Sequence, residues 1–163
     1  MITQKELKYY LTYDENTGNF YRNVSNNTRH LVGEIAGWLS KEGYKKLSLL
    51  GKTYSQHRLA WLYTYGEFPK QVIDHINGNP ADNRIVNLRE CTRNQNNYNC
   101  KLRKDSSSKI KNVKWNKFHK KWQVAIRVDK KEKHMGYFDD EELAELVAIE
   151  ARERYHKEFA RHN

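Results

Sequence analysis

An acidic residue and an imidazole stand side by side at Asp74 and His75, and two amides follow at Asn87 and Asn96. These four residues lie within 23 positions. Histidine titrates near neutrality, so it can accept a proton from water at physiological pH. Carboxylate and amide oxygens are hard ligands that Mg²⁺ accepts while it keeps several waters. The segment therefore combines a candidate general base with candidate metal ligands.

The pattern around these residues predicts the elements that must position them. Two apolar residues before Asp74 indicate a strand that runs into the acid and the imidazole, whose side chains point to opposite faces if the backbone is extended. Residues 77–83 supply turn chemistry, and residues 85–89 return as a second strand or an extended loop. Thr92 is the expected N-cap of a helix, which places Asn96 one turn in, on a face that can look back at Asp74.

The run DHINGNPADNRIVNL, followed by Asn96, resembles the HNH endonuclease pattern of homing and phage nucleases. The resemblance implies a ββα-metal fold and metal-dependent hydrolysis of DNA phosphodiester bonds. It implies that His75 is the general base and that Asp74 and Asn96 hold the metal. Asn87 would brace the loop and orient His75. The final motif position is often His in this family and is Asn here.

The resemblance also implies a cofactor and an upstream pair. The cofactor would be a divalent metal, Mg²⁺ first and Mn²⁺ as the alternative. His57-Arg58 resembles an upstream His-Arg of related nucleases, for which we expect a role in structure or phosphate contact. The cysteines, Cys91 and Cys100, lack the regular Cys/His spacing of a zinc centre, so no structural zinc is expected.

Each part of the motif has a plain structural alternative. An Asp-His pair in a turn is commonly a capping acid beside a surface imidazole, and the asparagines at 77, 79, 83 and 87 could be turn formers. The ordered conjunction of the residues favours the catalytic interpretation. Two other functions stay open: a non-cleaving, sequence-specific DNA-binding regulator, and an RNA-binding factor, for which the sequence lacks an aromatic surface motif.

Charge is concentrated in one stretch of the chain. The net charge is +10, and residues 101–134 hold 13 Lys and Arg against 3 Asp and Glu. A polyanion should therefore meet this stretch first, although a lysine-rich loop can also be a solvated surface. No apolar run has membrane-spanning length and no signal peptide opens the chain. We expect a soluble cytoplasmic protein without a membrane partner, in the host cytoplasm if a phage encodes it.

The expected fold class is α+β, in four segments. Residues 1–56 form a β-rich, DNA-contacting lead-in that opens with a helix capped by Thr3 and Glu6, and residues 57–100 form the ββα-metal HNH unit, beginning with a helix at 57–65. Residues 101–110 form a linker. Residues 111–163 form a three-stranded antiparallel sheet packed on one helix, because apolar and polar residues alternate and a helical pattern follows.

Residues 107–160, with NVKW, WQVAIRV and MGYF, resemble the plant APETALA/ethylene-response-factor DNA-binding domain. That resemblance implies a sheet laid into the major groove, with Arg127 as the candidate for guanine and the lysines for phosphate. The family usually has Gly where Asn112 stands. Together with Arg58, the expected DNA contacts are Lys111, Lys114, Asn116, Lys117, Gln123, Arg127, His134 and Tyr137. The expected core residues are Val113, Trp115, Trp122, Val124, Ile126 and Phe138, covered by a helical stripe with Leu143, Leu146, Val147, Ala151, Tyr155 and Phe159.

The sequence thus predicts a metal-dependent, site-directed DNA endonuclease of the phage homing type. Its substrate would be double-stranded DNA. With one catalytic unit and no obvious dimer seam, we expect a monomer that nicks one strand rather than cutting both.

Overall fold

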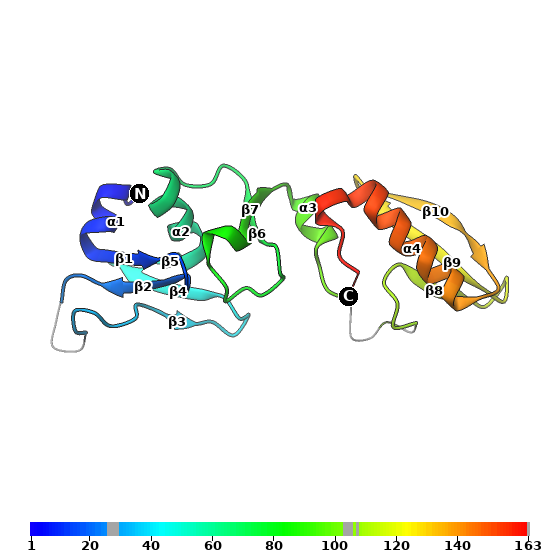
Figure 1. The fold of residues 1–163 in the computed structure, drawn as a ribbon, viewed down its shortest axis with the longest axis horizontal. Coiled ribbons are helices and arrows are strands. Elements are labelled where there is room, and N and C mark those ends of the chain that lie inside the picture. The colour runs from blue at the N-terminus through cyan, green and yellow to red at the C-terminus, as the bar shows by residue number, and fades with distance from the viewer. Residues whose placement is uncertain (26–29, 103–105, 107, 163) are drawn as a thin grey trace. The chain divides into compact units, whose positions relative to one another are not determined.

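A computed structural model describes residues 1–25, 30–102, 106 and 108–162. The chain is α+β, as the sequence predicts, and divides into two compact units, residues 1–91 and 92–163 (Figure 1). The division precedes the helix that carries Asn96. None of the helices in the described ranges is long and apolar enough to cross a membrane.

The first unit combines short antiparallel sheets with two helices (Figure 1). The first sheet pairs β1 with β2, the second has the order β3-β4-β5, and β6 pairs with β7. The elements are α1 (Gln4–Tyr10), β1 (Leu11–Asp14), β2 (Asn19–Arg22), β3 (Trp38–Leu39), β4 (Lys45–Leu49), β5 (Lys52–Ser55), α2 (Gln56–Tyr65), β6 (Val72–His75), the 3₁₀ turn η1 (Ile85–Asn87) and β7 (Leu88–Cys91).

Local sequence explains where the helices of this unit begin and end. The predicted capping box is present: the Thr3 hydroxyl accepts from the Glu6 amide, and the Glu6 carboxylate accepts from the Thr3 amide. Such a cap contributes about 1 kcal/mol to helix stability. Helix α2 ends at Gly66, which takes the left-handed backbone conformation that glycine adopts without strain.

One apolar core joins the elements of the first unit. Side chains from α1, β1, β2, β4 and α2 meet there, and β6 and β7 each add one residue. The β6–β7 hairpin is therefore anchored to the rest of the unit through its apolar positions. The fully buried or nearly buried members include Leu7, Leu11, Phe20, Leu47, Leu59, Leu62, Ile73 and Leu88.

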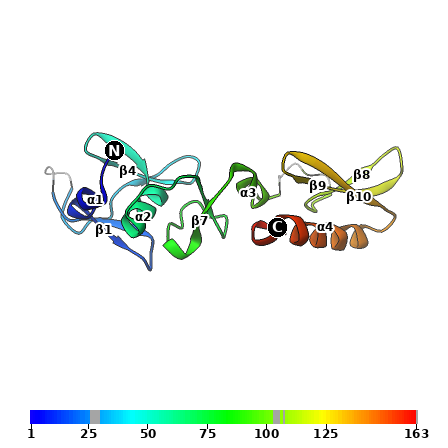
Figure 2. The ribbon, with the colours of Figure 1, turned by 90° about the horizontal axis from the view of Figure 1, so that it is seen from above.

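The second unit begins with a short helix and continues as the predicted three-stranded sheet on one helix. Strand β9 lies in the centre of the antiparallel order β10-β9-β8, and α4 covers one face of this sheet (Figure 2). Residues 103–105 and 107, within the predicted linker, lie outside the described residues. The elements are α3 (Arg93–Tyr98), β8 (Val113–Asn116), β9 (Lys121–Val128), β10 (Lys131–Phe138), α4 (Glu141–His156) and the 3₁₀ turn η2 (Lys157–Phe159).

The apolar stripe predicted for α4 is partly wrong. Leu143 and Leu146 are exposed, whereas Ala144 and Ala148 are fully buried against the sheet. Small alanine side chains let the helix backbone approach the strands, so the leucines on either side point outward. Ala151 and Phe159 are buried as predicted, and Val147 packs against the core.

The strand alternation is confirmed except at one tryptophan. Val113, Val124 and Ile126 are buried, and Trp122 and Phe138 pack at the core margin. Trp115 is 44% exposed and packs edge-on against Trp122, with ring centroids 5.1 Å apart. It lies on the face of Val113, toward the end of β8, and is not among the residues that pack on the sheet–helix core.

Candidate active site

The β6–β7 hairpin positions the adjacent acid and imidazole. Register pairs Asp74 with Arg89 and His75 with Leu88. Because successive strand residues point to opposite faces, the acid and the imidazole have different neighbours. Both are buried, at 5% and 7% exposure. Burial of two such polar side chains at a strand end requires specific partners.

Arg89 is the cross-strand partner of the Asp74 carboxylate. Its Nε and Nη2 donate to the same oxygen, Oδ2, over 2.9 and 2.8 Å. This pair compensates the carboxylate charge within a largely buried setting. A metal ion that binds Asp74 would therefore share this carboxylate with Arg89 or displace the guanidinium.

The His75 ring is held by Asn83, a residue that the sequence analysis treated only as a possible turn former. Nε2 of His75 lies 3.0 Å from Oδ1 of Asn83, and the Asn83 side chain is fully buried. An amide oxygen only accepts, so Nε2 carries the hydrogen and Nδ1 keeps the lone pair. This contact therefore leaves Nδ1 as the ring nitrogen that can accept a proton.

Two more rings line the neighbourhood of His75. The His57 ring lies 5.3 Å from it, and Tyr44 lies 6.0 Å away, between ring centroids. Burial is the main cause that lowers the pKa of His57 to about 4, and the nearby His75 contributes to this shift. His57 is therefore neutral at pH 7. The guanidinium of Arg58, the other half of the predicted upstream pair, lies over the Phe68 ring at 5.7 Å.

Asn87 braces the loop between the two strands. Its Oδ1 accepts from the Asn77 amide at 3.0 Å, and its Nδ2 donates to Oδ1 of Asn77 and to the Asp82 carbonyl at 3.1 and 2.8 Å. Hydrogen bonds from Arg84 are the main cause that lowers the pKa of Asp82 to about 2. Asn87 thus holds the peptide next to Asn83 and reaches His75 through that residue.

The loop is also fixed from the N-terminal hairpin. The Tyr13 hydroxyl donates to the Asn83 carbonyl at 2.7 Å, and burial raises the pKa of Tyr13 to about 12. A Cβ atom at Gly18 would come within 2.6 Å of the Asn83 and Arg84 backbone. The β1–β2 hairpin therefore packs directly on the loop that carries the His75 partner.

Comparison with known proteins bears on this arrangement. A family model described as HNH endonuclease matches residues 54–98. Protein 3.8 of Escherichia phage T7 is 32% identical over 113 residues, which cover 68% of this chain and 91% of that protein. No solved structure matches the chain. This chain belongs to the HNH endonuclease family. The matched segment holds every motif residue from Asp74 to Asn96, whereas the APETALA-like resemblance of residues 107–160 receives no support and stays a prediction.

The last residue of the HNH motif, Asn96, lies in α3, in the second unit. Thr92 caps this helix as predicted, through a reciprocal hydrogen-bond box with Gln95. Within the described ranges, no three His, Cys, Asp or Glu side chains are grouped as a metal site. A metal in this HNH protein would thus depend on donors of the kind that the motif offers, a carboxylate with amide oxygens, waters and substrate.

The residues predicted to contact DNA in the HNH protein's second unit differ in position and exposure. Register aligns Lys114, Gln123 and Tyr137 across the three strands, on the face away from α4. Lys111 is instead half-buried, and its ammonium donates to the carbonyls of Tyr98 and Cys100. The side chains of Lys117, Arg127 and His134 are also exposed. Gln123 and Asn116 are half-buried, and Asn116 donates to Gln123.

Proposed function

We propose that this HNH protein is a metal-dependent endonuclease that hydrolyses phosphodiester bonds of double-stranded DNA. The observation that carries the proposal is the His75 ring, held by Asn83 at the end of a buried strand, directly after Asp74. A family match over residues 54–98 supports this choice of chemistry.

In the proposed reaction, Nδ1 of His75 takes a proton from the attacking water. Asn83 holds the ring through Nε2, so the nitrogen with the lone pair faces a fixed direction while the water attacks phosphorus. The neutral His57 nearby adds no positive charge that would oppose a proton on His75. Asn87 keeps the loop in the conformation that this hydrogen bond needs.

Asp74 and Asn96 are the residues that we expect to hold the metal, Mg²⁺ or Mn²⁺. Their carboxylate and amide oxygens suit a hard divalent cation that retains waters. When bound, the cation supplies charge relief on the phosphoryl oxygens and on the leaving 3′ oxygen. Arg89 orients the Asp74 carboxylate from the neighbouring strand.

We further propose that the second unit supplies affinity for DNA. Exposed polar and basic side chains occupy the sheet face away from α4, as an APETALA-like domain would require. We favour a phage homing-type enzyme that acts as a monomer in the host cytoplasm and nicks one strand.

The decisive experiment is cleavage of supercoiled plasmid with and without Mg²⁺. We expect nicked product from the wild-type protein with metal, and none from His75→Ala. His30→Ala replaces an exposed histidine and serves as the matched control. Wild type and His75→Ala that leave the plasmid equally uncut, yet bind DNA, would favour the alternative of a non-cleaving regulator.

A further inference from the structure

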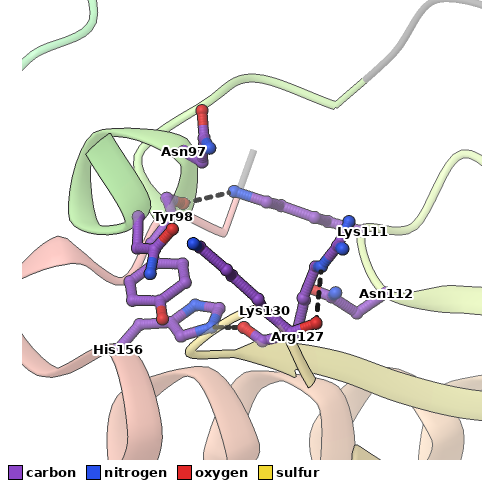
Figure 3. Close-up of a pocket in the computed structure, with 8 residues that line it drawn as sticks. Asn97, Tyr98, Lys111, Asn112, Arg127, Lys130 and His156 are labelled. Carbon is purple, nitrogen blue, oxygen red and sulfur yellow. Dashed lines mark hydrogen bonds between the residues drawn. The ribbon is translucent and has the colours of Figure 1, made fainter. Parts of the chain in front are cut away.

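A pocket within residues 92–163 carries cations that the cleavage mechanism does not use. It has a volume of about 520 Å³ and lies among α3, the turn before β8, the β9–β10 turn and the end of α4 (Figure 3). Lys111, Arg127 and Lys130 line it, together with three asparagine side chains. No carboxylate is among its lining residues, as far as the chain is described. The charged side chains among the lining residues are thus all cations, and asparagine amides lie beside them.

Lys111 is the half-buried cation of this pocket. Its ammonium is fixed by the carbonyls of Tyr98 and Cys100, at 2.9 and 2.7 Å, which are neutral partners at the end of α3. Burial, together with the nearby Arg152, lowers the pKa of Lys111 to about 8. Arg152 is itself 1% exposed and donates to the Lys111 carbonyl. The Glu145 and Glu153 carboxylates lie near Arg152, whereas an anion in the pocket would compensate the charge of Lys111.

Hydrogen bonds to the carbonyls at the end of α3 explain the position of Lys111. They do not explain the positions of Arg127 and Lys130. Nε of Arg127 donates to the Lys130 carbonyl at 3.3 Å, and its terminal nitrogens have no partner in the described part of the chain. The Lys130 ammonium and the side chains of Asn94 and Asn97 likewise make no hydrogen bond to described residues. Figure 3 shows the side chains of Lys111, Lys130 and Asn97 around the same space. These donors are available to a ligand.

We propose that this pocket binds one phosphate of the DNA backbone. Guanidinium and ammonium donors match phosphate oxygens, and amide N–H groups complete such a site. The aromatic pair in the pocket, Tyr98 and His156, stacks ring on ring at 3.9 Å and 3°, which uses one face of each ring and disfavours a base as the occupant. The inference rests on the proposed DNA function and adds a fixed anchoring point to it.

The test measures duplex binding by fluorescence anisotropy in EDTA, with full-length protein and two duplexes of unrelated sequence. The variants are Lys130→Gln and Arg127→Gln. The control, Lys120→Gln, removes an equal charge from an exposed position outside the pocket lining. Each pocket variant should weaken binding about tenfold on both duplexes. Each should also reduce the slope of log affinity against log salt by about one. Lys111→Met, checked by thermal melting, should act in the same direction.

Three outcomes would overturn the proposal. Pocket variants that bind like Lys120→Gln show that only overall charge matters. A loss on one duplex but not the other shows that the pocket reads bases. Amide shifts of Asn94 and Asn97 on titration with inorganic phosphate, combined with unchanged duplex binding, assign the pocket to a free phosphate ligand. Since EDTA prevents metal-dependent cleavage, a protein that passes this test and still leaves plasmid uncut contradicts the nuclease proposal alone.

Discussion

Around His75, polar side chains are buried and bonded to one another, whereas around Lys111 cations gather with no carboxylate among the described lining residues. In the first region Asp74 and His75 each have a hydrogen-bond partner on a neighbouring segment. These partners are Arg89 and Asn83. In the second, Arg127 and Lys130 present donors to solvent. Fixed geometry suits bond cleavage, and unsatisfied charge suits capture of a polyanion. Substitutions in the two regions should therefore change different measured quantities.

The largest expected effect is a loss of cleavage rate when His75, in the buried region, is substituted. His75→Ala should lower the cleavage rate by about 10²- to 10⁴-fold, because the proton acceptor is lost. Duplex binding in EDTA should stay close to wild type. Single-turnover cleavage and anisotropy measure the two quantities separately. If His75→Ala abolished binding and cleavage together, the buried region would not serve cleavage alone.

A smaller loss is expected at Asn83. Asn83→Leu removes the acceptor and should lower the cleavage rate by about 10- to 100-fold. Asn83→Asp keeps an acceptor oxygen and should retain more activity. The ¹⁵N chemical shifts of His75 should report hydrogen on Nε2 in the wild type and a mixture of tautomers in Asn83→Leu. Asn79→Ala, in the same loop, should change neither measurement. A wild-type ring with its hydrogen on Nδ1 would contradict the assigned base.

The buried region should also give the protein a pH-dependent stability. The pKa of His57 is lowered to about 4, so between pH 4 and its unfolded value near 6.5 the unfolded chain binds more protons. Stability should therefore fall as pH drops through this window, by on the order of 2 kcal/mol from this group. Thermal melting of His57→Gln should show a shallower dependence, while His119→Gln, at an exposed site, should follow the wild type. Parallel melting curves for wild type and His57→Gln would refute this assignment.

The smallest effect is expected on the single-turnover cleavage rate when a residue of the pocket around Lys111 is substituted and DNA is saturating. Lys130→Gln should weaken binding but leave single-turnover cleavage at saturating duplex within about twofold of wild type. The lost contact is one that the bound substrate and the transition state share equally. A much slower chemical step in this variant would show that the pocket positions the scissile bond.

The sequence predicts the elements that carry the motif because their signals are local. Thr3 and Thr92 cap helices, and the strand into Asp74 follows from apolar residues next to it. The role of Asn83 depends on how the loop folds back onto His75, and a turn-forming asparagine looks the same with or without that contact. The exposure of Leu146 depends on the close approach of alanines to the sheet, which helical periodicity alone does not reveal.

Asn83, the partner of His75, is held in place by Tyr13 and Gly18. Both residues lie more than fifty positions before it in the sequence. The matched family segment, residues 54–98, is consequently not a portable module in this protein. A shortened protein made from that segment would lose the contacts that Tyr13 and Gly18 make with the loop around Asn83. Transfer of residues 54–98 to another scaffold would have to include the β1–β2 hairpin.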